Sequence, residues 1–175
     1  MTSIRAAAVD ETAALVAVQR RIAAPVVVKG AQALSRFGEH AGGWLVIGAV
    51  GALLDRPRRA DWITAAAGVA AAHGASIAVK RVVRRERPRH PDVRVLVGTP
   101  SRLSFPSAHA TSTTAAAVIY GGLLRRRLVP VLVPPMLASR LVLGVHYPTD
   151  VLAGWALGAA VGTGVRRWLA RGVSR

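Results

Sequence analysis

The sequence has no cysteine and few acidic residues. Without cysteine, the chain can form neither a disulfide nor a metal site with thiolate ligands. Only 8 of the 175 residues are Asp or Glu, against 24 Lys and Arg, which gives a formal net charge of +16. A balance this basic is typical of proteins that bind nucleic acid or an anionic membrane surface. The first ten residues also lack an apolar segment followed by a small-residue cleavage site, so we expect no cleavable signal peptide.

Long apolar runs distinguish between these two partners. Apolar residues make up 52% of the chain, and the runs 62–79, 131–145 and 151–165 approach the length of a bilayer crossing, which is about 20 residues. A soluble nucleic-acid-binding protein would expose these runs to water and would aggregate. The sequence therefore predicts one all-α domain over residues 1–175. We expect a polytopic membrane helix bundle of about five to six helices that contacts the lipid bilayer and not nucleic acid.

The N-terminal part of the chain is less clearly apolar. Residues 1–10 are predicted to form a flexible tail. Residues 11–37 are rich in Ala and Val but carry four basic residues and a central proline. This pattern favours an amphipathic helix in the membrane interface, and an imperfect first crossing is the alternative. Residues 80–105 form a polar, basic segment that is too irregular to cross. The predicted crossings are 40–54, 62–79, 106–124, 128–145 and 148–168.

The connections between these crossings differ in charge. One end of the predicted bundle receives the short arginine-rich stretches 56–59 and 125–127 and the basic C-terminal residues. Short loops of this kind favour the cytoplasm. The other end, with residues 80–105 and 146–150, is therefore expected on the extracytoplasmic side of the plasma membrane.

The last predicted crossing has glycine at every fourth position, at Gly154, Gly158 and Gly162. A row of small residues lets a second helix approach closely. One interpretation is packing within the bundle, and the other is self-association into a homo-oligomer.

Three polar stretches lie at the same end of the predicted crossings, and the first contains Lys80 and Arg87. These residues are seven apart, about two helical turns, so they share a face if the preceding helix continues. Pro88 would then end that helix. On its own, such a basic run is more typical of a solvated or lipid-headgroup-binding surface.

The second polar stretch begins the crossing at residues 106–124. Pro106 and Ser107 are residue types that commonly start helices. The free N–H groups after Ser107 would form an anion site, and His109 would lie in the first turn beside it. On its own, a simple helix cap with an interfacial histidine accounts for the same residues.

The third polar stretch contains Arg140, His146 and Asp150. Arg140 can donate two parallel hydrogen bonds to a phosphate. If Pro148 begins the last helix, His146 lies just outside it and Asp150 lies in its first turn. A hydrogen bond from His146 Nδ1–H to Asp150 would fix the tautomer and leave Nε2 as a nucleophile. Alternatively, Asp150 only caps the helix.

Together the three stretches contain what phosphoryl transfer requires. The reaction needs mainly positioning and charge stabilisation, with a nucleophile and an acid for the departing oxygen. The basic side chains would hold a tetrahedral dianion, and the histidines would supply the nucleophile and the proton donor. The group contains no carboxylate pair, so we expect neither a metal nor a cofactor. Its members are Lys80, Arg87, Ser107, His109, Arg140, His146 and Asp150.

The order and spacing of these residues resemble the signature of the type 2 phosphatidic acid phosphatase (PAP2) superfamily. The pattern reads Lys-x6-Arg-Pro, then Pro-Ser-x-His, then Ser-Arg-x5-His-x3-Asp, and it spans residues 80–150. Ala108 departs from it, because the family usually has glycine there. Alanine keeps the backbone N–H, so we expect little loss. The resemblance implies metal-independent hydrolysis of a phosphomonoester or pyrophosphate through a phosphohistidine.

The resemblance also implies a role for each residue. His146 would attack phosphorus, Asp150 would orient His146 and stabilise its cation, and His109 would protonate the departing oxygen. Ser139 belongs to the pattern without a clear role of its own. The groups that would hold the phosphoryl oxygens are Lys80, Arg87, Ser107, Arg140 and the backbone amides of Ala108 and His109.

A site at the membrane boundary favours a lipid phosphate as substrate. The short, alanine- and arginine-rich chain resembles small PAP2 proteins of high-GC actinobacteria. One group of these removes the 5-phosphate from decaprenylphosphoryl-5-phosphoribose in cell-wall arabinan precursor synthesis, and that reaction is our leading expectation. Polyprenyl pyrophosphate, phosphatidylglycerophosphate and phosphatidate are the alternative substrates.

The alternative from another class is a non-catalytic membrane protein that binds anionic lipid. The polar segment has more arginines than one phosphate needs, which suggests a large anionic head group or contact with anionic lipid. These additional arginines are Arg81, Arg84, Arg85, Arg89, Arg94 and Arg102.

Overall fold

The computed structural model of the chain describes the backbone of residues 2–172 and the side chains of residues 11–171. Within that range the chain is helical, and the one β-bridge pairs Glu86 with Leu103. The predicted all-α fold is therefore confirmed. The α-helices are α1 (Thr2–Ile22), α2 (Pro25–Gly38), α3 (Gly42–Leu54), α4 (Arg59–Val83), α5 (Ala108–Leu123), α6 (Val129–Val142) and α7 (Pro148–Gly172). Short 3-10 helices, η1 (Glu39–Ala41) and η2 (Arg56–Arg58), precede α3 and α4.

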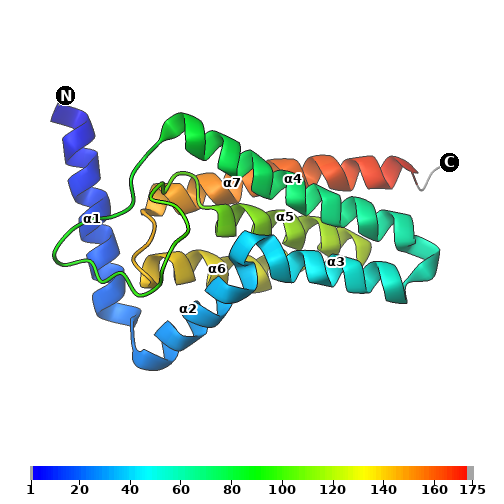
Figure 1. Ribbon diagram of the computed structural model, residues 1–175, viewed down its shortest axis with the longest axis horizontal. Coiled ribbons are helices and arrows are strands. Elements are labelled where there is room, and N and C mark those ends of the chain that lie inside the picture. The colour runs from blue at the N-terminus through cyan, green and yellow to red at the C-terminus, as the bar shows by residue number, and fades with distance from the viewer. Residues whose placement is uncertain (1, 173–175) are drawn as a thin grey trace.

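Five helices form a bundle, and the two N-terminal helices close one end of it. Helices α3 to α7 run along the long axis of the molecule, whereas α1 lies across one end and α2 leads from there into the bundle (Figure 1). Helix α5 packs against α4, α6 and α7, and most of its residues are buried. The α4–α5 connection and the first turns of α5 and α7 lie at the end that α1 crosses. This is the end to which the predicted site belongs.

The glycine row of α7 packs against α5 within the same chain. A Cβ on Gly154 would lie 2.5 Å from the Ser107 carbonyl oxygen, and a Cβ on Gly158 would lie 2.3 Å from that of Thr111. Side-chain carbons do not approach backbone oxygens so closely, so glycine is what allows α7 to reach the α5 backbone. Packing within the bundle is thus the observed use of these glycines. Self-association through Gly162 and its neighbours would need a face that α5 already covers.

The N-terminal region departs from the prediction. Helix α1 begins at Thr2 and therefore includes most of the range 1–10 that was predicted to be a tail. The range 11–37 is divided between two helices instead of forming one. The break comes at Ala24, which has the extended backbone that a following proline favours, and Pro25 then begins α2. The placement of these helices in the membrane interface stays a prediction.

Two glutamines attach the N-terminal helices to the α4–α5 connection. Gln19 of α1 is almost fully buried, and its Nε2 donates to the Arg94 carbonyl at 2.7 Å and to the Val142 carbonyl at 2.9 Å. Gln32 of α2 donates to the Leu96 carbonyl at 2.9 Å. These bonds fix the irregular segment across the end of the bundle.

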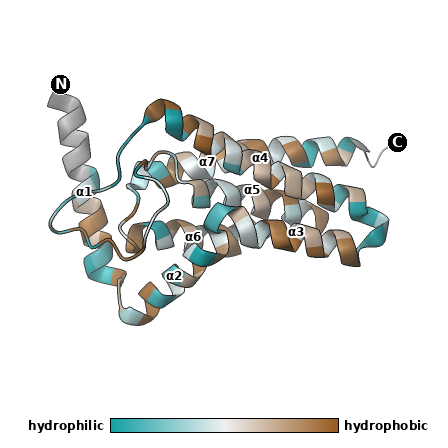
Figure 2. Cartoon of the chain, in the orientation of Figure 1, coloured by the Kyte–Doolittle hydropathy of each residue, from teal (hydrophilic) through white to brown (hydrophobic). Residues whose placement is uncertain are grey.

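The outer surface of the bundle is apolar. Two helical stretches, Pro25–Leu54 and Arg56–Val83, are long and apolar enough to cross a membrane. Hydrophobic residues follow α3 and α4, and hydrophilic residues gather in the turn that joins them (Figure 2). Exposed apolar side chains in such number indicate contact with lipid. They include Val46, Leu53, Leu54, Ile63, Val131, Leu152, Trp155 and Trp168.

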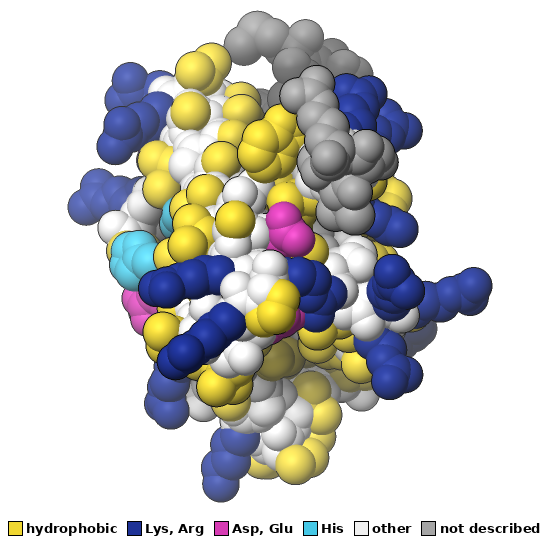
Figure 3. Space-filling view, turned by 90° about the vertical axis from the view of Figure 1, so that its right-hand side faces the viewer, with side chains coloured by type: hydrophobic (Ala, Val, Ile, Leu, Met, Phe, Trp, Pro, Cys, Tyr) yellow, Lys and Arg dark blue, Asp and Glu magenta, His cyan; other side chains and the backbone are white. Residues whose placement is uncertain are grey.

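The end of the bundle opposite α1 is strongly basic. The α3–α4 turn, the α5–α6 turn and the last turns of α7 meet there. Viewed from that end, Lys and Arg side chains surround the molecule (Figure 3). The exposed arginines of these segments are Arg56, Arg58, Arg59, Arg125, Arg126, Arg127, Arg166, Arg167 and Arg171.

Candidate active site

The three polar stretches meet around one cavity of about 270 Å³. It lies between the end of α4, the first turn of α5, the end of α6 and the α6–α7 connection. Both His109 and His146 line it, so fragments that are far apart in the sequence share one site. The predicted site residues on its wall are Lys80, Arg87, Ala108, His109, Arg140 and His146. Asp150 and Ser139 contact the wall residues His146 and Arg140, and Ser107 directly precedes Ala108.

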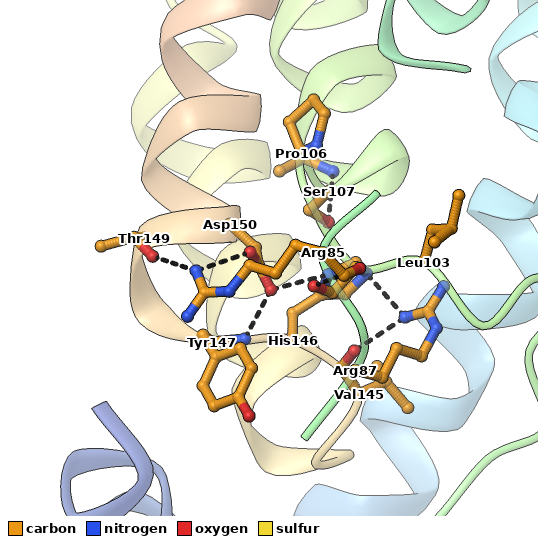
Figure 4. A network of polar contacts seen from close by, with 12 residues as sticks. Arg85, Arg87, Leu103, Pro106, Ser107, Val145, His146, Tyr147, Thr149 and Asp150 are labelled. Carbon is orange, nitrogen blue, oxygen red and sulfur yellow. Dashed lines mark hydrogen bonds and ion pairs between the residues drawn. The ribbon is translucent and has the colours of Figure 1, made fainter. Parts of the chain in front are cut away.

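The tautomer of His146 follows from its two neighbours. Its Nε2 lies 3.1 Å from Arg87 Nη1, and its Nδ1 lies 3.6 Å from Asp150 Oδ2 (Figure 4). A guanidinium can only donate, so Nε2 must accept and carry a lone pair. The ring proton is therefore on Nδ1, facing the carboxylate. The 3.6 Å separation is longer than a hydrogen bond, and such distances in ligand-free sites often shorten when substrate binds.

His146 is buried, with 2% of its surface exposed. Burial, with a smaller effect of the Arg87 charge, lowers the pKa of His146 to about 3, although Asp150 acts in the opposite direction. Burial also lowers the pKa of Arg87, to about 10. At neutral pH the imidazole is thus uncharged and the guanidinium is charged. This is the combination that a nucleophilic nitrogen beside a bound phosphate requires.

Asp150 is fully buried and serves two neighbours at once. Its Oδ2 accepts a hydrogen bond from the Tyr147 backbone N–H at 2.8 Å and also faces His146. Its Oδ1 accepts from Arg85 Nη1 at 3.1 Å. The two interpretations of Asp150 are therefore compatible, because the carboxylate caps the first turn of α7 and also lies against the imidazole.

Arg85 also belongs to the site. Its sequence position marks it only as one of several additional arginines in the polar segment. Besides Asp150, its guanidinium donates to Thr149 Oγ1 at 2.6 Å and stacks over the Tyr147 ring at 4.1 Å from the centroid. It also forms an ion pair with Glu11 of α1, whose carboxylate in turn accepts from the Thr149 backbone N–H at 3.1 Å. Glu11 lies in a different part of the chain from the other residues, so sequence spacing gave no signal for this group.

Arg140 is the most deeply placed cation of the site, with 2% of its surface exposed. Its Nε donates to Ser139 Oγ at 3.3 Å, and Ser139 Oγ donates to the Met136 carbonyl at 2.6 Å. Arg140 Nη2 has no hydrogen-bond partner among the described residues. A buried donor without a partner costs free energy, and a phosphoryl oxygen in the cavity would satisfy it. Ser139 thus holds the guanidinium in place.

Lys80 and Arg87 hold the α4–α5 connection around the cavity. Lys80 Nζ donates to the Leu103 carbonyl at 3.1 Å and to the Pro106 carbonyl at 3.0 Å. Arg87 donates to the Ser101 carbonyl at 2.8 Å and to the Val145 carbonyl at 2.7 Å. Each cation therefore shapes the loop that surrounds the anion site.

The expectation that Lys80 and Arg87 share one helix face is wrong. Helix α4 ends at Val83, and Arg84 takes a left-handed backbone with φ of 54°. The two cations reach the same cavity because the chain folds back after Arg84, where Glu86 pairs with Leu103.

The predicted helix start at Ser107 is confirmed. Ser107 is the N-cap of α5, and its Oγ accepts from the Ala110 N–H at 3.5 Å, a long contact. Its own N–H donates to the Asp150 carbonyl at 2.9 Å and so joins the first turns of α5 and α7. Ala108 and His109 follow it on the cavity wall. A contact between the Ser107 hydroxyl and phosphate stays a prediction.

His109 is positioned by α2, which the sequence analysis did not include in the site. Its Nε2 lies 2.9 Å from the Ser35 carbonyl oxygen. A carbonyl only accepts, so Nε2 carries a proton and Nδ1 is the nitrogen left for proton transfer. Gly38 makes room for the ring, because a Cβ there would lie 2.7 Å from His109 Cδ2. Within the described residues, no group of three or more His, Asp or Glu side chains is placed to hold a metal ion.

Comparisons with known proteins identify the family of the chain. Residues 61–173 match the PAP2 superfamily. A protein of Mycolicibacterium smegmatis named decaprenylphosphoryl-5-phosphoribose phosphatase is 59% identical over 145 residues, which are 82% of this chain and 81% of that protein. A protein of the same name from Mycobacterium tuberculosis is 53% identical over 153 residues, which are 87% and 86% of the two chains.

The fold also matches a solved structure. The crystal structure of a transmembrane PAP2 type phosphatidylglycerolphosphate phosphatase from Bacillus subtilis superimposes with a TM-score of 0.77 at 23% identity, over 98% of this chain and 88% of that one. The chain therefore belongs to the PAP2 superfamily and is a membrane-embedded phosphatase. The predicted family, reaction class and membrane bundle are confirmed.

Proposed function

We propose that this protein removes the 5-phosphate of decaprenylphosphoryl-5-phosphoribose, a step in making cell-wall arabinan precursors. Two relatives with that name are more than half identical to this chain over more than four fifths of both proteins. The observation that carries the chemistry is the placement of His146, whose Nδ1 faces Asp150 and whose Nε2 lies against Arg87 at the wall of the cation-lined cavity.

The reaction proceeds in two balanced steps. The substrate binds to protein in which His109 carries a second proton on Nδ1, because its Nε2 proton is held by the Ser35 carbonyl. First, His146 Nε2 attacks phosphorus, the bond from phosphorus to the ribose 5-oxygen breaks, and His109 Nδ1 donates its proton to that oxygen. Asp150 stabilises the imidazolium that forms, since its carboxylate faces Nδ1 at 3.6 Å. Water then attacks the phosphohistidine, His109 takes a proton from that water, and the nitrogen–phosphorus bond breaks to release phosphate.

The cations stabilise the negative charge that the phosphoryl group carries in both steps. Arg140 has a free N–H at the cavity, and Lys80 and Arg87 line the same cavity as the first turn of α5. Fixed donors of this kind need no reorganisation as the charge shifts toward the leaving oxygen. The Ser107 hydroxyl and the amides of Ala108 and His109 would add donors at the helix start.

We place the protein in the plasma membrane with this site on the extracytoplasmic side. The basic end of the bundle lies away from the cavity, and short arginine-rich loops favour the cytoplasm. The substrate head group would then enter the cavity from the outer leaflet while its tail stays in the bilayer.

Phosphate release from a panel of lipids tests this function. Purified protein in detergent with EDTA should prefer the decaprenylphosphoryl phosphoribose over polyprenyl pyrophosphate, phosphatidylglycerophosphate and phosphatidate. His146→Ala should abolish release, whereas His90→Ala, which changes an exposed histidine of the α4–α5 connection, should retain it. A strict requirement for magnesium would contradict the mechanism. Preference for another lipid of the panel would contradict the substrate.

A further inference from the structure

Among the ionisable residues of the membrane-crossing stretches, Glu39, His40 and His73 line the cavity but have no part in the chemistry above. Glu39 and His40 lie midway along the apolar stretch Pro25–Leu54, and His73 lies within Arg56–Val83. Ionisable side chains at membrane depth are costly, and they usually face a polar cavity and serve a function. These three residues therefore need an explanation that catalysis at His146 does not supply.

The three residues line the same cavity as the candidate nucleophile. The rings of His40 and His73 are next to each other in an edge-to-face arrangement, with centroids 6.3 Å apart. His73 Nδ1 is buried and has no hydrogen-bond partner among the described residues. A buried polar atom of this kind indicates a missing partner. The cavity beside it is where that partner would be.

The position of this group relative to the phosphate site follows from helix geometry. His73 is seven residues before Lys80 on α4, which places it on the same face and about 10 Å along the axis. His40 is opposite, in the short helix η1, where His40 and Ala41 have left-handed backbones with φ of 50° and 59°. Such conformations are uncommon for residues other than glycine and persist where their surroundings hold them. The group thus forms a second wall of the cavity, about 10 Å along α4 from Lys80.

The chemistry of this wall matches hydroxyl groups. An uncharged imidazole offers one donor and one acceptor, and a carboxylate accepts. A sugar hydroxyl needs both kinds of partner. A terminal phosphate or pyrophosphate at this position would meet both Glu39 and Arg36, whose charges oppose each other, so this wall has no net charge that favours an anion. The wall therefore favours an uncharged polyol next to the reacting phosphate.

We propose that Glu39, His40 and His73 form a sugar subsite that binds the ring hydroxyls of a phosphosugar head group while its phosphate lies against His146. This proposal rests on the proposed function and deepens it, because it assigns the residues that distinguish a phosphosugar lipid from other lipid phosphates. The sugar would fill the part of the cavity between the two walls, with the lipid tail leaving toward the bilayer.

Paired substrates that differ by one hydroxyl test the subsite. Wild-type protein should hydrolyse a prenyl-phosphoryl 5-phosphoribose with a kcat/KM about tenfold above that of the corresponding 2-deoxyribose or 3-deoxyribose lipid, the effect of one unsatisfied buried hydrogen bond. His73→Leu should lower kcat/KM for the ribose lipid about tenfold and remove its preference over at least one deoxy analogue. His73→Asn, which keeps a donor and an acceptor, should restore part of the preference.

A substrate without a sugar provides the control. Release of phosphate from para-nitrophenyl phosphate should be the same in wild type and His73→Leu. His90→Leu, at an exposed histidine outside the cavity, should change neither measurement. Equal loss of both activities in His73→Leu would overturn the subsite, because the residue would then support the fold or the chemistry in general.

The outcomes separate the subsite from the proposed function. One outcome is that wild type prefers the phosphoribose lipid while both variants, His73→Leu and His40→Leu, still distinguish the ribose lipid from its deoxy analogues. In that case only the subsite is overturned. If wild type prefers a lipid without a sugar in the panel assay, the proposed function fails and the subsite fails with it.

Discussion

Arg85 Nη1 lies 3.1 Å from Asp150 Oδ1, on the side of the carboxylate that does not face His146. This ion pair neutralises a buried carboxylate and fixes its orientation. Because Glu11 and Thr149 hold the same guanidinium, helix α1 is connected to the catalytic end of α7. Arg85 is therefore a positioning residue that acts through Asp150.

Arg85→Ala should lower kcat about 10- to 100-fold with little change in KM. A charge-assisted hydrogen bond contributes about 1.5 to 3 kcal/mol, and each 1.4 kcal/mol is a factor of ten in rate. Arg85→Lys keeps the charge and should recover part of kcat. Arg81→Ala, at an exposed arginine near the end of α4, is the matched control. A rise in KM alone would show that Arg85 binds substrate instead of positioning Asp150.

Glu11 should act through Arg85. Glu11→Ala should lower kcat by a smaller factor, since the pair between Arg85 and Asp150 remains. The double variant Glu11→Ala/Arg85→Ala should be no worse than Arg85→Ala alone, because residues in one network are not additive. A double-mutant cycle in kcat measures this coupling. Additive losses would mean that Glu11 reaches the site by another route.

Gly38 provides a test of how α2 positions His109. A Cβ there would lie 2.7 Å from His109 Cδ2 and 3.2 Å from Met136 Cε, so Gly38→Ala should displace the imidazole and reduce kcat. The matched control is Gly30→Ala in the same helix, where a Cβ would meet nothing within 4 Å. That variant should keep full activity and gain up to about 1 kcal/mol of helix stability. Unchanged kcat in Gly38→Ala would contradict the placement of His109 against α2.

The lowered pKa of His146 predicts a dependence of stability on pH. Its pKa is about 3 in the folded protein and about 6.5 in the unfolded chain. Between these values the unfolded chain binds a proton that the folded protein does not, so stability falls as pH falls below about 6.5. At pH 5 the loss from this residue is about 2 kcal/mol.

Thermal unfolding in detergent at pH 7.5 and pH 5 measures that loss. The decrease on acidification should be smaller in His146→Gln than in wild type by about that amount. Equal decreases in the two proteins would mean that His146 is solvated or already protonated in the folded state.

The sequence predicted those parts of the site that depend on short spacing. Ser107 caps α5, and His146 and Asp150 stand on either side of the first residue of α7, because local helix rules place them there. The chain's long apolar runs similarly predicted the bundle helices to within a few residues.

The sequence did not predict features of the site that depend on contacts between distant parts of the chain. Arg85 is one of several arginines in its segment, and only the folded chain shows that it pairs with Asp150. Ser35 and Gly38 carry no polar signal, since one acts through a carbonyl and the other through the absence of a side chain. The left-handed Arg84 ends α4 early, and no proline or glycine marks that position.

The proposed mechanism requires that His146 forms a covalent bond to phosphorus. The direct measurement is mass spectrometry of His109→Gln protein after brief incubation with para-nitrophenyl phosphate, whose leaving group departs without a proton from His109, followed by a quench at alkaline pH, where phosphohistidine is retained. Loss of His109 slows hydrolysis of the intermediate, because no base remains to activate water. We expect one added phosphoryl group on His146, and none in His109→Gln/His146→Ala. Phosphate release by His109→Gln without any labelled protein, or a label on a different residue, would contradict it.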